Sequence, residues 1–354
     1  MLLKLNKHLY VSLSATMIPL ILLLTVRAVV GIDIINYASG GPGLAWANNL
    51  WVPMAGFTGD GTLISSYYNW SPYPDIPTSR HSSLFDVPFT FVPMLWGCNS
   101  TYIEPFLEQV ANNFSDAILT PQRAILGFNE PDQTGQAECS PEEAAQTWIE
   151  VIEPLKSQGY RLGSPAVTSG YSGREWMAQW YEACNGSCNP DFTAVHWYDL
   201  VAQNFIEHIQ YYHSTYGKNI WVTEFAPQNF SVYNTTTDTY DGQATYVEIQ
   251  RFMDVATSYM KSVSWVERWF WFGAMYDMQG VNTLDALFAE SGKQKRTGAL
   301  NELGVQYAGS NGSVLLSDHT SRASSKLSEG SYNVQELFLF GLIVMVSVRV
   351  LQRI

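Results

Sequence analysis

Two glutamates stand at the ends of apolar runs, where a carboxylate needs a physical reason to be. Residues 125–132, ILGFNEPD, begin as a buried strand would and end in a polar cluster that contains Asn129 and Glu130. Residues 220–226, IWVTEFA, hold Glu224 inside an otherwise apolar run. A lone charge in such a setting is costly unless it has partners or a task. A structural ion pair is one explanation. The other is a pair of catalytic carboxylates, as glycoside hydrolysis requires.

Eight short apolar or aromatic runs could form the strands that position these carboxylates. Glu130 ends the fourth run and Glu224 lies near the end of the seventh, whereas Glu267 begins the eighth. Turn residues or helical stretches separate most of the runs. The runs are 43–48, 63–70, 89–96, 124–130, 161–167, 192–199, 220–226 and 267–275.

Helical patterns occupy several of the gaps between the runs. In residues 140–159, Ser140 is a typical N-cap, Pro141 fits the first helical position and Glu143 completes a capping box. Residues 49–62 show no clear helical pattern. Further helices are expected at 105–114, 205–217 and 242–260.

The alternation of eight strands with helices predicts a (β/α)8 barrel, with residues 29–308 as its single catalytic domain. A doubly wound open sheet is the alternative, but the first expected strand is not followed by a glycine-rich turn. Active sites of barrels lie at the carboxyl ends of the strands. The barrel therefore predicts that Glu130 and Glu224 meet on one face, and that Glu267 lies at the opposite end.

Aromatic residues make up 14% of the 354-residue chain, which favours a large core or a groove that stacks sugar rings. Several polar and aromatic side chains stand at or near the expected strand ends. Tyr198 could hydrogen-bond the nucleophile, Trp271 could form a sugar platform, and Asn129 could bond a sugar hydroxyl. Packing against a loop is the alternative for the tryptophans. The candidate binding residues are Asn129, Trp70, Trp96, His196, Tyr198 and Trp271.

The runs, taken in order, resemble glycoside hydrolase family 128, the endo-β-1,3-glucanases related to the alkali-sensitive linkage protein of fungal walls. The resemblance extends from residue 43 to about 308 and includes GLAWAN, YYNWSP, FVPMLWG, ILGFNEPD, LGSPAV, VHWYD, WVTEFA and WFWFGAM. It implies a retaining hydrolase of β-1,3-glucan, with Glu130 as acid/base and Glu224 as nucleophile. The alternatives are a non-hydrolytic glucan-binding wall protein and a barrel glycosidase or transglycosidase that acts on another glycan.

Four cysteines and few candidate metal ligands limit the covalent chemistry. Cys184 and Cys188 flank a turn and could close a small loop, which leaves Cys98 to pair with Cys139 over the catalytic face. Three connectivities are formally possible. The sequence contains no CxxC, and its six histidines show no ligand spacing. We therefore expect two disulfides and neither metal nor cofactor.

The N-terminus predicts export. Residues 1–28 resemble a signal peptide, with Lys4 and Lys7 before the uncharged run 9–26 and a cleavage site after Ala28. An uncleaved signal anchor is the alternative. Seven N-x-S/T sequons favour a glycosylated protein outside the cytosol. They begin at Asn69, Asn99, Asn113, Asn185, Asn229, Asn234 and Asn311.

The C-terminus predicts a link to the outer membrane face or the cell wall. Residues 309–336 are expected to form a Ser/Gly-rich linker, and the tail 337–354 begins with a 12-residue apolar run, LFLFGLIVMVSV. Cleavage after Ala323 would fit a glycolipid-anchor signal. The alternatives are a helix packed on the barrel or a single membrane span. We expect membrane contact only through the terminal segments. The net charge of −13 argues against nucleic acid as a partner.

Overall fold

The computed structural model describes most of the residues that the sequence assigns to the barrel. These are residues 40–47, 52–59, 61–74, 88–113, 123–237, 239–276, 278, 280–289 and 298–309. The predicted signal peptide, nearly all of the linker and the apolar tail lie outside them. Within the part that is described, none of the helices has the length and apolar character needed to cross a bilayer.

Six parallel strands form one sheet in the order β3-β2-β1-β10-β7-β6. Their bounds are Gly41–Ala45 for β1, Ser66–Tyr68 for β2, Thr90–Phe91 for β3, Phe192–Tyr198 for β6, Asn219–Ala226 for β7 and Val266–Trp271 for β10. A second parallel pair joins β4 (Ala124–Ile125) to β5 (Arg161–Leu162).

Two isolated parallel bridges close these strands into a ring. Met94, beyond β3, pairs with Leu126 next to β4, and Gly163 next to β5 pairs with Phe192 at the start of β6. The eight strands thus follow one another around a closed parallel barrel in sequence order, which confirms the predicted (β/α)8 fold. An additional antiparallel hairpin, β8 (Tyr233–Asn234) with β9 (Thr239–Tyr240), follows β7.

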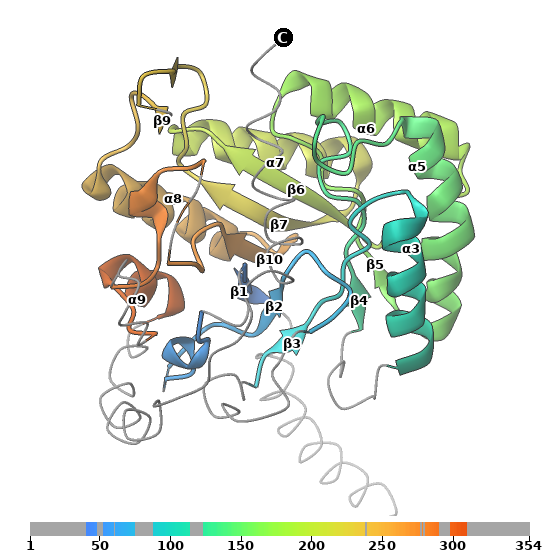
Figure 1. Cartoon of the computed structure of the whole chain (residues 1–354), viewed down its shortest axis with the longest axis horizontal. Helices are drawn as coiled ribbons and strands as arrows, with labels where there is room; N and C mark the ends of the chain where they lie inside the picture. The colour runs from blue at the N-terminus through green and yellow to red at the C-terminus, as the bar shows by residue number, and fades with distance from the viewer. Residues whose placement is uncertain are drawn as a thin grey trace, which may run out of the picture. The chain divides into compact units, whose positions relative to one another are not determined.

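The helices lie outside the strands, with α3, α5 and α6 beside β4 and β5 and with α8 and α9 on the other side (Figure 1). The π-helical residues 108–113 and 148–152 continue α3 and α5, and a 3-10 turn at 153–158 follows the latter. The helix bounds are Ser100–Leu107 for α3, Pro141–Thr147 for α5, Tyr171–Cys184 for α6, Ala202–Tyr216 for α7, Tyr246–Ser262 for α8 and Glu302–Ala308 for α9.

The capping box predicted for α5 is present, because Ser140 accepts a bond from the backbone of Glu143 and the Glu143 carboxylate bonds back. Among the described residues of 49–62, only a 3-10 turn forms, at Ala55–Phe57. Helix α6, which contains Gly173, was not predicted from the sequence. A Cβ at that position would meet the carbonyl oxygen of Thr168 at 2.2 Å, so the close approach of the two segments requires glycine.

Glu267 lies at the amino end of β10 and has a structural task. Its carboxylate accepts bonds from Arg161 at 2.8 Å, from Trp221 at 2.8 Å and from Asn219 at 2.6 Å. Burial raises the pKa of Glu267, but these donors outweigh burial and hold the pKa below its usual value. This network ties β5, β7 and β10 together at the base of the barrel, away from Glu130 and Glu224.

Both predicted disulfides form. Cys98 and Cys139 have Cα atoms 6.1 Å apart, and Cys184 and Cys188 have Cα atoms 5.4 Å apart, within the range a disulfide can span. The first bridge joins the segment after β3 to the segment after Glu130. The second closes a turn at the end of α6.

The two bridges close loops of different length, and their contributions to stability should differ accordingly. They span 41 and 4 residues of sequence, for which loop-closure entropy gives about 4 and about 2 kcal/mol. We expect the Cys98→Ser/Cys139→Ser protein to lose about twice as much free energy of unfolding as the Cys184→Ser/Cys188→Ser protein in urea titrations. Equal losses would contradict the chain-entropy argument.

Candidate active site

The acidic segment after β4 makes a strained turn that aims Glu130. The backbone angle φ of Glu130 is 44°, which lies in the left-handed region that few residues other than glycine adopt. Two backbone hydrogen bonds hold the turn. The backbone N–H of Asn129 donates to the carbonyl of Trp96, and the backbone N–H of Glu130 donates to the carbonyl of Ala166 at 2.7 Å. Strain of this kind persists only where the surroundings impose it, and it is frequent at functional sites.

A side-chain contact fixes the same turn to the next loop. Asp132 accepts a bond from the backbone amide of Thr168 at 2.9 Å and a second bond from the hydroxyl of that residue. Burial raises the pKa of Asp132, while the bonds from Thr168 lower it in part. Asp132 therefore supports the turn rather than facing the second glutamate.

Glu224 lies at a β-bulge in β7. Between Val222 and the end of the strand, the pairing of β7 shifts by one residue against both β6 and β10. Over this stretch β7 has one more residue than either neighbour. The carbonyl oxygen of Thr223 accepts a bond from the hydroxyl of Tyr68 at 2.7 Å. Bulges re-aim a side chain, and this one places the Glu224 carboxylate among polar partners.

Two donors hold the Glu224 carboxylate. The indole N–H of Trp70 donates to Oε1 at 2.7 Å, and the hydroxyl of Tyr198 donates to Oε2 at 2.6 Å. Trp70 also has a positive φ, of 57°. Burial raises the pKa of Glu224, whereas His196 and these two donors offset part of the rise. The predicted contact between Tyr198 and Glu224 is therefore present.

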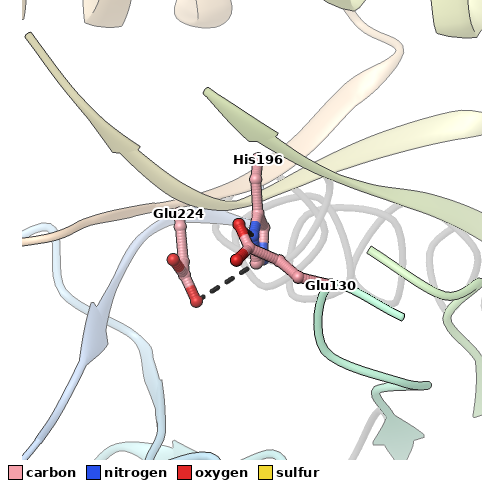
Figure 2. A group of neighbouring side chains, drawn as sticks. All are labelled: Glu130, His196 and Glu224. Atoms are coloured by element: carbon pink, nitrogen blue, oxygen red, sulfur yellow. Dashed lines mark hydrogen bonds and ion pairs between the residues drawn. The ribbon is translucent and has the colours of Figure 1, made fainter. Parts of the chain in front are cut away.

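His196 lies between the two glutamates (Figure 2). Its Nδ1 is 3.0 Å from Oε1 of Glu130, and its Nε2 is 3.5 Å from Oε1 of Glu224. One oxygen of each carboxylate and one ring nitrogen lie within 4.8 Å of one another. Burial alone lowers the pKa of His196, but the two carboxylates outweigh burial and raise it. An imidazolium here would donate to both glutamates.

Comparisons with known proteins bear on the family and the fold of the chain. Residues 43–307 match the family described as the glycosyl hydrolase catalytic core. The chain is 27% identical to a curdlan-specific exo-β-1,3-glucanase of Blastomyces gilchristii, solved with glucose, over 77% of this chain and 99% of that one, with a TM-score of 0.54. That enzyme is assigned to glycoside hydrolase family 128. The chain belongs to glycoside hydrolase family 128.

Other solved members of family 128 have the same fold. An endo-β-1,3-glucanase of Sorangium cellulosum is 26% identical over 75% of this chain and 97% of its own, with a TM-score of 0.56. An exo-β-1,3-glucanase of Cryptococcus neoformans is 24% identical over 76% and 98%, with a TM-score of 0.60. The search of curated proteins gave no significant match. Family membership makes the chain a glycoside hydrolase.

Three further candidates surround the glutamates of this family 128 enzyme. Trp70 is half-buried and bonds Glu224 directly. Asn129 is buried and donates to Gln136 at 3.2 Å, while its side-chain oxygen has no partner among the described residues. Trp96 is buried against Tyr102, and its indole N–H likewise lacks an acceptor in the described part of the chain. Both unpaired atoms are themselves buried, so the structure does not expose either of them to a ligand.

Trp271 does not join the site. Its side chain is fully buried, donates to the backbone of Asp285 at 2.8 Å and packs against Phe225 of β7 and Phe252 of α8. The prediction that Trp271 forms a sugar platform is therefore wrong, because its indole is enclosed on the helix side of the sheet and has no free face. Alternation along β10 decides this placement.

Phe272, the next residue in sequence, takes the position expected of Trp271. Its ring lies 5.8 Å from that of Trp70 and 5.7 Å from that of Tyr198. Phe272 was not among the residues predicted for the site, and neither was Tyr68, whose ring lies 4.8 Å from that of Trp70. The run WFWF contained the signal for Phe272, but only the register of β10 tells which of its rings faces the glutamates.

The cluster of Glu130, His196 and Glu224 is also close enough to hold a metal ion, which the sequence spacing did not indicate. However, both Glu224 oxygens already accept bonds from Trp70 and Tyr198. A cation would have to share or displace these donors. We therefore interpret the cluster as a hydrogen-bonded acid–base group.

Proposed function

We propose that this chain is a retaining endo-β-1,3-glucanase, with Glu130 as the acid/base and Glu224 as the nucleophile. The separation of the two carboxylates carries the proposal. Oxygens of Glu130 and Glu224 lie within 4.8 Å of each other, which suits the retaining spacing of about 5 to 5.5 Å and not the inverting spacing of about 6.5 to 9.5 Å. An inverting enzyme needs a wider gap, because the sugar and the attacking water must both fit between its two carboxyl groups.

The geometry supports a two-step displacement. Glu224 attacks the anomeric carbon while Glu130 gives its proton to the departing glycosidic oxygen, which breaks the bond to the leaving chain. Glu130 then takes a proton from water, the water oxygen attacks the same carbon, and Glu224 leaves as a carboxylate. Trp70 and Tyr198 stabilise the Glu224 carboxylate before and after the reaction through their bonds to it.

The substrate class rests on the relatives. The Blastomyces gilchristii enzyme is curdlan-specific and the Sorangium cellulosum enzyme is an endo-β-1,3-glucanase. The first of these enzymes cuts in the exo mode and the second in the endo mode, so the relatives do not fix the cutting mode. The endo mode is therefore part of our proposal, and the products of the reaction test it. The intact pair of glutamates disfavours a purely glucan-binding wall protein, which needs neither carboxylate.

Substitution of each glutamate tests the assignment. We expect Glu224→Gln to abolish turnover of laminarin while it still binds the glucan. Glu130→Gln should lose about 10² to 10⁴-fold on laminarin but much less on an aryl glucoside, whose leaving group needs no proton. Glu175→Gln on α6, whose side chain is exposed, serves as the control and should behave as wild type.

The products discriminate among the alternatives. Wild-type enzyme should release β-configured oligosaccharides from laminarin, as followed by NMR during the reaction, and should leave mannan, xylan and cellulose intact. Products of the α configuration would overturn retention. Activity on one of the other glycans would overturn the substrate class.

The bond from Tyr198 predicts a shift in the pH profile. This bond lowers the pKa of Glu224, so its loss in Tyr198→Phe should raise that pKa further. The nucleophile must be ionised, and activity is lost as pH falls through its pKa. The acidic limb of kcat/KM should therefore move to higher pH, and the plateau should fall about tenfold. Tyr259→Phe on α8, whose hydroxyl bonds Gln210, should leave the profile unchanged. An unshifted limb in Tyr198→Phe would contradict the role of this bond.

We also propose that the protein is exported and held at the outer membrane face or the cell wall. The two disulfides are typical of an oxidising compartment. Among the sequons, Asn99 and Asn185 are exposed. The side-chain nitrogen of Asn229, in contrast, already donates to the backbone carbonyls of Asp241 and Gly242. The first two are therefore the better acceptors of a glycan.

A phosphatidylinositol-specific phospholipase should release the enzyme from intact cells if the tail is exchanged for a glycolipid after Ala323. Heat-inactivated phospholipase is the control. An enzyme that stays bound and retains an epitope placed after Arg353 would refute the anchor.

A further inference from the structure

One carboxyl group of the barrel is fully buried and takes no part in the mechanism above. Asp285 ends the 3-10 turn Thr283–Asp285, which lies in the loop after β10. Its exposed fraction is 0%, whereas the other two residues of the turn are exposed. Neither oxygen of the Asp285 side chain has a hydrogen-bond partner within the part of the chain that the structure describes. A buried carboxylate without partners is very costly, so such a group stays neutral by keeping its proton.

No cation compensates Asp285 from the described elements around its turn. These elements are α8, the end of β10 and α9. Their inward titratable groups are the phenols Tyr246 and Tyr307, each of which accepts a bond from a backbone amide. Glu267 and Arg268 lie at the opposite, amino end of β10. Burial alone raises the pKa of Asp285, well above its ordinary value. The charged residues of α8 and α9 are exposed, and they are Glu248, Arg251, Asp254, Lys261 and Glu302.

Backbone contacts tie the turn of Asp285 to the end of β10. The indole N–H of Trp271 donates to the carbonyl of Asp285 at 2.8 Å. The backbone N–H of Leu287 donates to the carbonyl of Gly273 at 2.9 Å. A Cβ on Gly273 would meet the carbonyl oxygen of Asp285 at 2.2 Å, so the two segments touch directly. The strand end and the turn are therefore held together on the side of the barrel where Asp285 is buried.

Phe272 connects this packing to the nucleophile. It directly follows β10, and its ring contacts the rings of Trp70 and Tyr198. These two side chains are the donors that hold the Glu224 carboxylate. A movement of the turn therefore reaches the catalytic group through a single residue.

We propose that Asp285 is a pH-sensitive latch in the loop after β10. While its carboxyl keeps the proton, the turn stays packed against α8 and holds Phe272 beside the catalytic residues. Transfer of that proton to water leaves a charge that the surrounding core cannot solvate, so the turn opens to let water reach the carboxylate. The position of Phe272 is then lost as pH rises.

The sign of the effect follows from the two protonation states of Asp285. In the unfolded chain it titrates at the ordinary aspartate pKa of about 3.9, whereas burial raises the pKa in the folded chain. Its contribution to stability is therefore fully present below the unfolded pKa and is lost as pH rises through the folded pKa. In the range between the two pKa values, each pH unit costs about a factor of ten in the folding equilibrium.

Asp285→Asn tests the latch, because an amide has nearly the shape of the protonated acid but cannot ionise. Unfolding in urea is measured for the full-length variant and for wild type at a series of pH values. The ratio of their folding constants should rise about tenfold for each pH unit above about pH 5 and level off beyond the folded pKa. All other groups titrate equally in both proteins and cancel in this ratio.

Asp254→Asn on α8, whose side chain is exposed, is the matched control for these titrations. Its folding constant relative to wild type should not change with pH. A ratio for Asp285→Asn that is equally independent of pH would overturn the latch, since the buried acid would then carry no excess proton in the folded state.

Hydrogen exchange of the wild type tests the latch without any substitution. The opening free energies of the Gly273 and Leu287 amides, both hydrogen-bonded in the loop, should fall as pH rises once intrinsic exchange rates are corrected for. The amides of β7 should keep their opening free energies. A fall of equal size in both segments, or in neither, would contradict local release of the turn.

Activity gives a reading at the site, and this arm rests on the function proposed above. The basic limb of kcat/KM on laminarin should lie at higher pH in Asp285→Asn than in wild type, while the acidic limb stays in place. Coincident basic limbs would overturn the link from Asp285 to Phe272. If the wild type hydrolyses no β-1,3-glucan, the proposed function fails, whereas the urea titrations and hydrogen exchange still decide whether the latch exists.

Discussion

The structure depends on holding two carboxylates close together in a buried place. Like charges at this distance repel, and burial removes the water that would screen them. His196 lies between Glu130 and Glu224 and faces both, while Trp70 and Tyr198 donate to Glu224. These donors offset the cost of holding two glutamates close together in a partly buried place.

Two local irregularities bring the pair together. Glu130 occupies a left-handed turn, and Glu224 occupies a bulge at which β7 slips against both neighbours. Each irregularity has a cost that the surroundings meet. Backbone bonds to Trp96 and Ala166 hold the turn, and the hydroxyl of Tyr68 satisfies the carbonyl of Thr223 at the bulge. The regular strands make the barrel rigid, whereas the turn and the bulge orient the two carboxylates.

The two ends of the barrel differ in the partners of their polar and charged side chains. At the amino ends of the strands, Glu267 is paired with Arg161 and bonded by Trp221 and Asn219, so its charge serves stability. At the carboxyl ends, the side-chain oxygen of Asn129 and the indole N–H of Trp96 lack partners among the described residues, and Phe272 lies beside Trp70 and Tyr198. Glutamates thus have different partners at the two ends of the barrel, since Glu267 pairs with an arginine whereas Glu130 and Glu224 share a histidine.

The sequence by itself determined the eight strands, the α5 capping box and the pair of glutamates, because each leaves a local pattern of apolar runs, caps or isolated charges. It favoured the two disulfides that form, but only the structure excluded the other connectivities. It did not determine α6, whose glycine interrupts the helical pattern. Nor did it decide which aromatic residues face the site, since in a strand buried on both faces inside and outside look alike. Trp271 lies on the helix side and Phe272 beside Trp70 because of the register of β10. The bridging position of His196 likewise exists only once β6 lies beside β7 and opposite the turn after β4, since three distant segments must meet to create it.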